Sequence, residues 1–220
     1  MRDLLKSLRR RALFAASGTH RPISGHWGYD RGQPIDRWYI ERFLDSCRQD
    51  VHGDALEVKS ADYVHRFGSD LRRVEVLDVD EANTQATLVG DLAGEPFVAA
   101  ESFDCFVLTQ TLQYVFDLDA AVRNAHRLLR PGGSLLVTVP ALSRLTHELE
   151  LDDFWRFTSA SLRRLLEPAF GSEVQVTARG NLVSSIAFLT GLAAGELTER
   201  ELAEDDLRFP VLVTARAVRR

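Results

Sequence analysis

Several short apolar segments of this sequence end in acidic or amide side chains. A carboxylate at such a position can accept hydrogen bonds from a ribose diol, and one on a neighbouring segment can bind an adenine amino group. A single aspartate there is also a common turn former or helix cap, so only the ordered set is informative. The members of that set are Glu57, Asp78, Asp80, Asp91 and Gln110.

The segments that position these side chains alternate with helical patterns. The clearest helix begins at Asp117, an N-cap residue, and ends before Pro131-Gly132-Gly133, and a second begins at Thr158. A crossover helix between two buried strands makes those strands parallel. We therefore predict an α/β fold with a doubly wound, mostly parallel sheet of seven strands. The predicted strands are 55–58, 74–79, 86–89, 103–109, 135–139, 174–178 and 211–218.

The domain organisation follows from these patterns. Residues 1–53 read as an N-terminal helical extension that includes an amphipathic helix beginning at Pro34, and residues 54–220 read as one α/β domain. A helical insertion over 181–208 precedes the last strand. In an open α/β sheet the ligand cleft lies at the carboxyl ends of the strands. We expect the insertion to cover the substrate side of that cleft, and leave open its use as a homodimer interface.

Composition excludes several classes of protein. The 220 residues carry 27 Lys and Arg against 32 Asp and Glu, a net charge of −5, which argues against a nucleic-acid partner. Two cysteines, Cys47 and Cys105, are too few for a disulfide framework and fit a reducing cytoplasm. The longest uncharged stretch, 180–195, is too short and too polar to span a membrane. No ligand spacing indicates a metal site.

Three segments together resemble the class I S-adenosylmethionine-dependent methyltransferases over roughly residues 54–170. FDCFVLTQTLQYVFDLDAAVRNAHRLLRPGGSLLVTVP is similar to the family's fourth strand, helix and PGG turn. LVGDL is similar to its adenine-contacting segment, and DDFWRFTSASLRRLL to a stretch after the fifth strand. WGYDRGQPIDRWYIERFL resembles a subgroup associated with bacterial glycan or natural-product biosynthesis. The resemblance implies a Rossmann-like fold and S-adenosylmethionine as cofactor.

The first motif departs from the family. Where the family has E-x-G-x-G, this chain has Glu57-Val58-Lys59-Ser60-Ala61, so both glycines are missing. Lys59 can reach the methionine carboxylate of the cofactor, or it can extend past the cofactor into solvent. Because both glycines are missing, a second interpretation of the whole protein stays open: a non-catalytic, methyltransferase-like module that binds a partner protein.

The resemblance also implies roles for individual residues. Glu57 orients the first loop, and Asp80, with Asp78 as the alternative, takes the ribose hydroxyls. Asp91 and the Leu92 backbone hold adenine, and Gln110 contacts the methionine portion. Tyr114 stands where related sequences often have histidine, and we interpret it as a core aromatic residue.

The reaction that fits is methyl transfer to a small molecule or saccharide, most simply to oxygen. An alcohol acceptor needs a base, and the loop after the fifth strand offers His147 or Asp153. His147 also reads as a surface histidine, Asp153 as a loop anchor beside Arg156, and His126 as a packing residue. A nicotinamide dehydrogenase would need a G-x-G-x-x-G turn that the sequence lacks.

Overall fold

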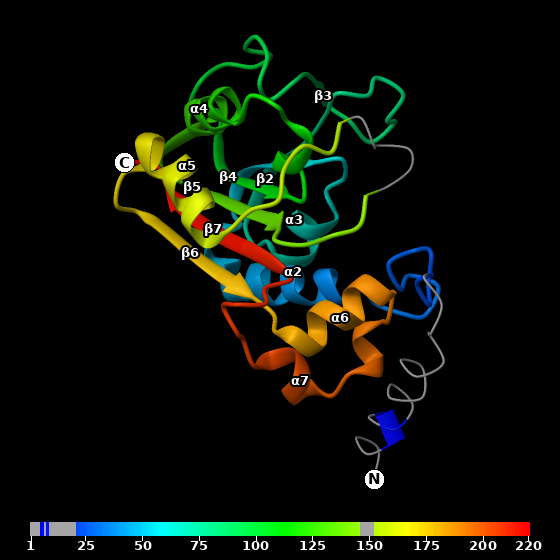
Figure 1. Ribbon diagram of the computed structural model, residues 1–220. Helices are drawn as coiled ribbons and strands as arrows, with labels where there is room; N and C mark the ends of the chain where they lie inside the picture. Colours follow the sequence, from blue (N-terminus) through cyan, green and yellow to red (C-terminus); the bar gives the residue numbers. More distant parts are fainter. Residues whose placement is uncertain (1–4, 7, 9–20, 146–151) are drawn as a thin grey trace.

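A seven-stranded sheet forms the centre of the protein in the computed structural model, which describes residues 5, 6, 8, 21–145 and 152–220. The strand order is β3-β2-β1-β4-β5-β7-β6 (Figure 1). Neighbouring strands are parallel except that β7 is antiparallel to both β5 and β6. The predicted doubly wound, mostly parallel sheet is confirmed.

The fourth strand has its predicted bounds, and the other six differ from theirs by one to six residues. The third strand is shorter than predicted, and the fifth begins earlier because it continues through Pro131-Gly132-Gly133. A β-carbon on Gly133 would lie 2.9 Å from the Arg130 carbonyl oxygen and 3.2 Å from that of Asp104, so this residue allows the close approach of β4. The strands are β1 (Gly53–Val58), β2 (Leu71–Asp78), β3 (Leu88–Val89), β4 (Phe103–Thr109), β5 (Leu129–Pro140), β6 (Val174–Arg179) and β7 (Leu212–Val218).

Side-chain caps define the starts of the two helices predicted to begin at Asp117 and Thr158. The Asp117 carboxylate accepts a hydrogen bond from the Ala120 amide at 2.9 Å, and the Thr158 hydroxyl accepts one from the Ser161 amide, as the sequence predicts. Pro34 is the N-cap rather than the first helical residue of its helix. The helices are α2 (Ile35–Ser46), α3 (Asp62–Phe67), α4 (Leu118–Leu128), α5 (Ser159–Phe170), α6 (Leu182–Thr190) and α7 (Glu199–Ala203).

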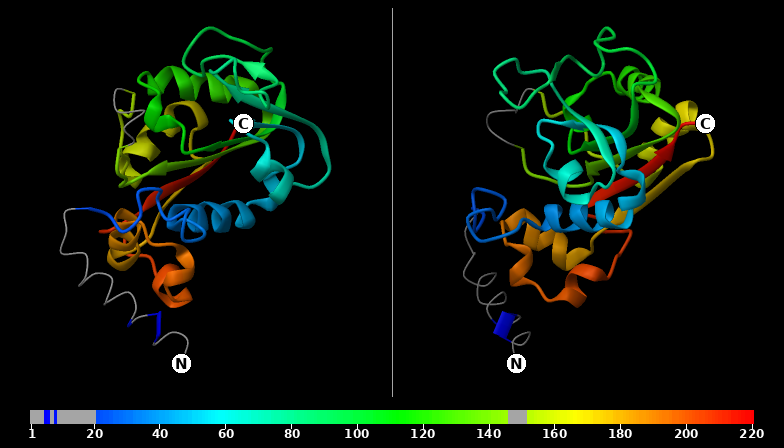
Figure 2. Two further views of the ribbon diagram at one scale, coloured as in Figure 1. Left: turned by 90° about the vertical axis from the view of Figure 1, so that its right-hand side faces the viewer. Right: turned by 180° about the vertical axis from the view of Figure 1, so that it is seen from behind.

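Helices cover both faces of the sheet (Figure 2). On one face α4 and α5 pack against the odd-numbered strand positions of β5, among them Leu135 and Val137. On the other face α2, α3 and α6 pack against Ala55 and Cys105. Alternate residues of each central strand therefore belong to two separate apolar cores, which is the pattern of a buried parallel sheet.

The N-terminal segment contributes to the core through α2. Ile35, Ile40 and Leu44 of this helix are fully buried, and α2 contacts α3, α6 and β7. The expected insertion is present as α6, a short 3₁₀ turn and α7, which lie beside α2 (Figure 1). The first turn of α2 and the insertion thus meet at the carboxyl ends of the parallel strands.

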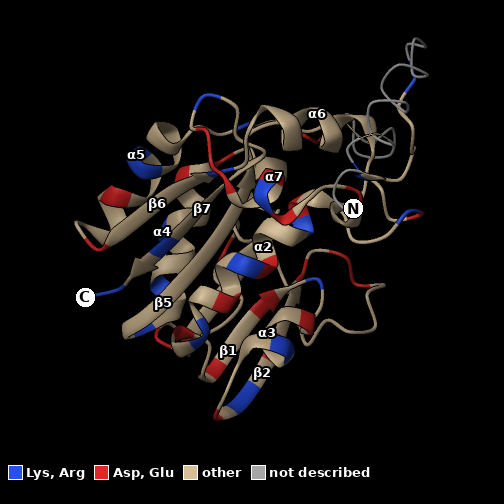
Figure 3. Cartoon of the chain, turned by 90° about the horizontal axis from the view of Figure 1, so that it is seen from below, with Lys and Arg blue, Asp and Glu red and all other residues tan. Residues whose placement is uncertain are grey.

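A buried ion pair joins α2's end of the molecule to the last strand. Asp50 is 7% exposed, and its two carboxylate oxygens accept hydrogen bonds from Arg216 Nε at 2.8 Å and Nη2 at 2.6 Å. The Ser134 hydroxyl donates to the same carboxylate at 2.9 Å. Elsewhere basic and acidic residues are interspersed, as along α2 and α7 in Figure 3.

We expect Asp50→Ala to lower the free energy of unfolding by about 2–3 kcal/mol, because it leaves the Arg216 guanidinium partly buried without its carboxylate. Urea-induced unfolding measures this change. Asp45→Ala is the matched control, since Asp45 pairs with Arg48 at the exposed surface and should cost less than about 0.5 kcal/mol. Equal losses in the two variants would contradict the assigned importance of the buried pair.

Candidate active site

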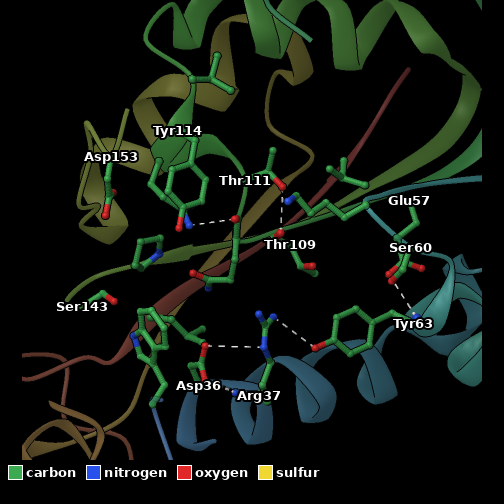
Figure 4. Close-up of a pocket in the computed structure, with 18 of the residues that line it drawn as sticks. Asp36, Arg37, Glu57, Ser60, Tyr63, Thr109, Thr111, Tyr114, Ser143 and Asp153 are labelled. Atoms are coloured by element: carbon green, nitrogen blue, oxygen red, sulfur yellow. Dashed lines mark hydrogen bonds and ion pairs between the residues drawn. The ribbon is translucent and has the colours of Figure 1, made fainter. Parts of the chain in front are cut away.

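A large cavity opens where the parallel strands end. It has a volume of ≈ 1320 Å³, more than the roughly 300–1,000 Å³ usual for one small ligand. The ends of β1, β2, β4 and β5 form one wall, and the first turn of α2 forms the wall opposite (Figure 4). Phe188 of α6 also lines the cavity. The cavity therefore has room for two ligands between the sheet edge and the N-terminal helix.

Glu57 lies beneath the loop that leaves β1. Its side chain is 2% exposed, and its carboxylate accepts hydrogen bonds from the amides of Val64 at 2.8 Å and Tyr63 at 3.3 Å (Figure 4). Burial raises the pKa of Glu57 to about 7, and these two amide hydrogen bonds oppose that rise. The carboxylate thereby holds the first turn of α3 against the end of β1.

Lys59 follows with the backbone conformation of a glycine. Its φ is 72°, in the left-handed region that a lysine rarely adopts. The Lys59 amide donates to the Leu77 carbonyl at 3.0 Å, and its carbonyl accepts from the Asn83 side chain at 2.8 Å. The loop thus keeps the backbone shape that the first missing glycine would provide, with an exposed lysine side chain at the cavity wall.

The two aspartates near the end of β2 differ in environment. Asp78 is the last residue of the strand and is 5% exposed, and its carboxylate accepts a hydrogen bond from Asn83 Nδ2 at 2.7 Å. Asp80 lies two residues beyond the strand, is exposed, and caps the amide of Ala82 at 2.9 Å. Both line the cavity. The second strand therefore ends at Asp78, one residue before the predicted end at 79, and Asp80 lies beyond it.

Asp91 and Leu92 come after β3, also at the cavity wall. Asp91 is exposed, and one of its carboxylate oxygens accepts from the Ala93 amide at 2.9 Å. Leu92 is 4% exposed, and its carbonyl accepts from Asn124 of α4 at 2.9 Å. The structure thus places this pair beside the end of β2, as the motif order predicts.

Two glutamines after β4 leave polar atoms without partners. Gln110 has a φ of 48°, and no residue of the described chain accepts a hydrogen bond from its buried Nε2. Gln113 is 4% exposed and donates from Nε2 to the Gln110 carbonyl at 2.9 Å, while its buried Oε1 has no donor among the described residues. Both side chains line the cavity. The sequence does not predict Gln113 as a site residue, because only its place in the TLQY segment after the fourth strand connects it to the cavity.

Tyr114 is not a core residue. Its side chain is 36% exposed and lines the cavity, where Figure 4 shows it pointing into the same space as Asp153. The interpretation as a core aromatic is therefore wrong. The short 3₁₀ helix Leu112–Tyr114 explains the difference, because it buries Leu112 and turns Tyr114 outward.

The histidine and aspartate residues considered as bases or packing residues lie in different environments. His147 lies outside the described residues. Both oxygens of the Asp153 carboxylate accept hydrogen bonds from Arg156, at 2.5 and 2.8 Å. His126 packs edge-on against Phe170 with ring centroids 5.0 Å apart, away from the cavity lining, and burial lowers its pKa.

Side chains of α2 and the segment before it form the opposite wall. Asp36 and Arg37, with Tyr29 from the preceding loop and Tyr63 from α3, line the cavity. The sequence predicts the amphipathic helix but no role in a site for these four residues, because no motif or spacing connects them to the strand ends.

The described residues contain neither a metal-ligand cluster nor a membrane-spanning helix. Within residues 21–145 and 152–220 no cluster of three His, Cys, Asp or Glu side chains is arranged to hold a metal ion. No helix in the same part of the chain is long and apolar enough to cross a membrane.

Solved structures share this fold at low sequence identity. An S-adenosylmethionine-dependent methyltransferase from Thermotoga maritima is 20% identical with a TM-score of 0.54, covering 84% of this chain and 94% of that one. One from Mesorhizobium loti is 17% identical with a TM-score of 0.53, covering 84% and 98%. Phosphoethanolamine N-methyltransferase 2 from Haemonchus contortus, solved with S-adenosyl-L-methionine, is 13% identical with a TM-score of 0.50, covering 90% and 60%.

Sequence families give the more specific result. No curated protein matches the chain significantly. The family model for a methyltransferase domain matches residues 44–137, which run from the end of α2 through most of β5 and include Glu57, Asp78, Asp91 and Gln110. The match covers less than half of the chain and lies within the seven-stranded fold that the solved structures share.

Proposed function

We propose that this protein transfers a methyl group from S-adenosylmethionine to an oxygen atom of a small molecule or saccharide. The observation that carries the proposal is the ordered set of polar groups around one cavity at the strand ends. When bound, the cofactor supplies an electrophilic methyl group on a sulfonium. Positioning the acceptor oxygen in line with that methyl group can supply much of the rate enhancement.

The residues on the sheet side fit the cofactor. Asp78 would accept hydrogen bonds from the ribose hydroxyls, because it is the strand-end carboxylate and its burial strengthens charge-assisted hydrogen bonds. Asp91 and the Leu92 backbone would meet adenine. Two observations support the methionine end: the unpartnered Gln110 Nε2 would donate to a carboxylate, and Lys59 stands at the same wall.

In the loop after β5, the hydrogen bonds of Asp153 fit a structural role better than a role as the catalytic base. Asp153 is held by both nitrogens of the Arg156 guanidinium, so it serves to fix this loop at the cavity edge. His147 stays an expectation as a base. Phe188 brings α6 to the cavity, which supports the expected place of the insertion on the acceptor side.

The setting of the reaction is part of the same proposal. Cys47 and Cys105 are both free and buried, which supports a reducing, cytoplasmic environment. The motif WGYDRGQPIDRWYIERFL supports a place in glycan or natural-product biosynthesis. Residues 27–44, which carry this motif, contribute to the cavity wall through Trp27 and Arg37 among others.

Calorimetric titration of the full chain with S-adenosylmethionine and with S-adenosylhomocysteine tests the proposed function. We expect one site that binds both, because the cavity groups named above address parts that the two molecules share. A folded protein that binds neither compound would contradict the proposal and favour a partner-binding module.

We expect Asp78→Asn to weaken S-adenosylhomocysteine binding about 10–100-fold, the loss of one or two charge-assisted hydrogen bonds. Asp80→Asn is the matched control and should change the affinity less than about 3-fold, since its carboxylate is exposed and caps its own turn. The same titration measures both. A large effect confined to Asp80→Asn would show that Asp80, and not Asp78, binds the ribose hydroxyls.

We expect Glu57→Gln to alter how stability depends on pH. Below pH 4.5 Glu57 is protonated in both the folded and unfolded chains, whereas between pH 4.5 and about 7 only the unfolded chain ionises. The free energy of unfolding of the wild type should therefore fall relative to Glu57→Gln across this window, by about 3 kcal/mol in total. Urea unfolding at several pH values measures it, and parallel pH profiles for the two proteins would contradict the raised pKa.

A further inference from the structure

A polar cluster on the first turn of α2 faces the cavity across from the cofactor side. It consists of Asp36 and Arg37, together with the phenol groups of Tyr29 and Tyr63. Figure 4 shows Asp36 and Arg37 projecting from α2 into the cavity, with Thr109 and Ser143 on the far side. Asp36, Arg37 and Tyr29 lie before residue 44, where the methyltransferase family match begins, and Tyr63 lies within the match.

Asp36 has one oxygen available to a ligand. Its side chain is 16% exposed, and Oδ1 accepts a hydrogen bond from the Arg37 amide at 2.8 Å. The closest cationic nitrogen to Oδ2 is Arg37 Nε at 3.9 Å, beyond hydrogen-bond distance. Burial raises the pKa of the Asp36 carboxyl, although the Arg37 guanidinium opposes the shift. A desolvated carboxylate with an open oxygen is suited to accept a proton.

Arg37 is held by phenols rather than by a close carboxylate. Its Nε donates to the Tyr29 hydroxyl at 3.0 Å and its Nη1 to the Tyr63 hydroxyl at 3.5 Å. In the described part of the chain no group accepts a hydrogen bond from Nη2. The guanidinium is therefore oriented at two of its nitrogens and still offers donors to a ligand.

Two other charged side chains near the cluster already have partners. Glu41 pairs with Arg66 at 2.7 Å. The Arg144 guanidinium stacks over the Trp27 ring at 3.8 Å and donates to the Gly25 carbonyl. Asp36 and Arg37 thus present one negative and one positive group side by side, a pair with no net charge to favour an anionic or a cationic ligand.

We propose that Asp36 and Arg37 bind adjacent hydroxyl groups of an uncharged, polyhydroxylated acceptor, and that Asp36 takes the proton of the hydroxyl that is methylated. The inference rests on the proposed function and specifies its acceptor. In the transfer the acceptor oxygen forms a bond to the methyl carbon as the carbon–sulfur bond breaks. The hydroxyl proton passes to Asp36 Oδ2, and the sulfur leaves as a neutral thioether. The Tyr29 and Tyr63 rings provide apolar surface for the carbon face of such a molecule.

The first experiment measures binding to the full-length protein saturated with S-adenosylhomocysteine. The probes are methyl glycosides in matched sets: a neutral hexoside, 6-deoxyhexoside and pentoside, with the uronic acid and amino sugar that correspond to the hexoside. We expect a neutral glycoside to bind at least about 10-fold more tightly than the charged pair. Preference for a charged glycoside, or no glycoside binding, would overturn the inference. Failure to bind S-adenosylhomocysteine at all would instead contradict the proposed function.

The second experiment compares variants with the glycoside that binds best. We expect Asp36→Asn to lower methyl transfer from labelled S-adenosylmethionine by about 100–10,000-fold, with Asp36→Glu restoring part of it. Arg37→Met should weaken glycoside binding about 10-fold. S-adenosylhomocysteine affinity should change less than about 2-fold in all three.

The controls are Asp45→Asn and Arg48→Met, two exposed side chains of the same helix region that pair with each other. They should leave transfer and binding unchanged. Unchanged transfer by Asp36→Asn, or a loss matched by the controls, would overturn the role of Asp36. Parallel losses of cofactor and glycoside affinity in Asp36→Asn would also overturn it, because they indicate a structural role.

Discussion

The buried carboxylate of Glu57 is the constraint on which the strand-end side of the cavity depends. It accepts two amide hydrogen bonds from the start of α3, which hold the loop between β1 and α3 in its observed conformation. That conformation requires a left-handed residue at position 59 and places it against the end of β2 through the Leu77 and Asn83 hydrogen bonds. The ends of β1 and β2 are thereby fixed relative to each other by the chain's own hydrogen bonds.

The helix α2 combines two roles that its amphipathic pattern separates by face. Ile40 and Leu44 are fully buried against the sheet, which anchors the helix. Because α2 begins at the strand ends, its first turn carries Asp36 and Arg37 to the cavity. A segment that begins outside the family match thus builds the cavity wall opposite the strand ends.

Two glutamine side chains at the same edge have buried polar atoms without partners among the described residues. The side chains of Gln110 and Gln113 leave a buried donor and a buried acceptor unsatisfied, and the Gln110 backbone is in the left-handed region. Such atoms cost free energy in the folded chain unless a ligand or water completes their hydrogen bonds. Strain and unsatisfied groups at one site are typical of binding sites, where the surrounding fold compensates for them.

The sequence by itself determined the sheet, the caps at Asp117 and Thr158, and the order of the polar residues at the strand ends, because strand and helix periods and capping chemistry are local properties. It extended the second strand one residue past Asp78, since the end of a strand depends on pairing with its neighbours. It also gave no role to Asp36, Arg37 or Gln113, and it wrongly assigned Tyr114 to the core. Only the tertiary structure decided these points, because the cavity joins side chains from α2, the strand ends and a 3₁₀ turn that are far apart in the chain and share no spacing rule.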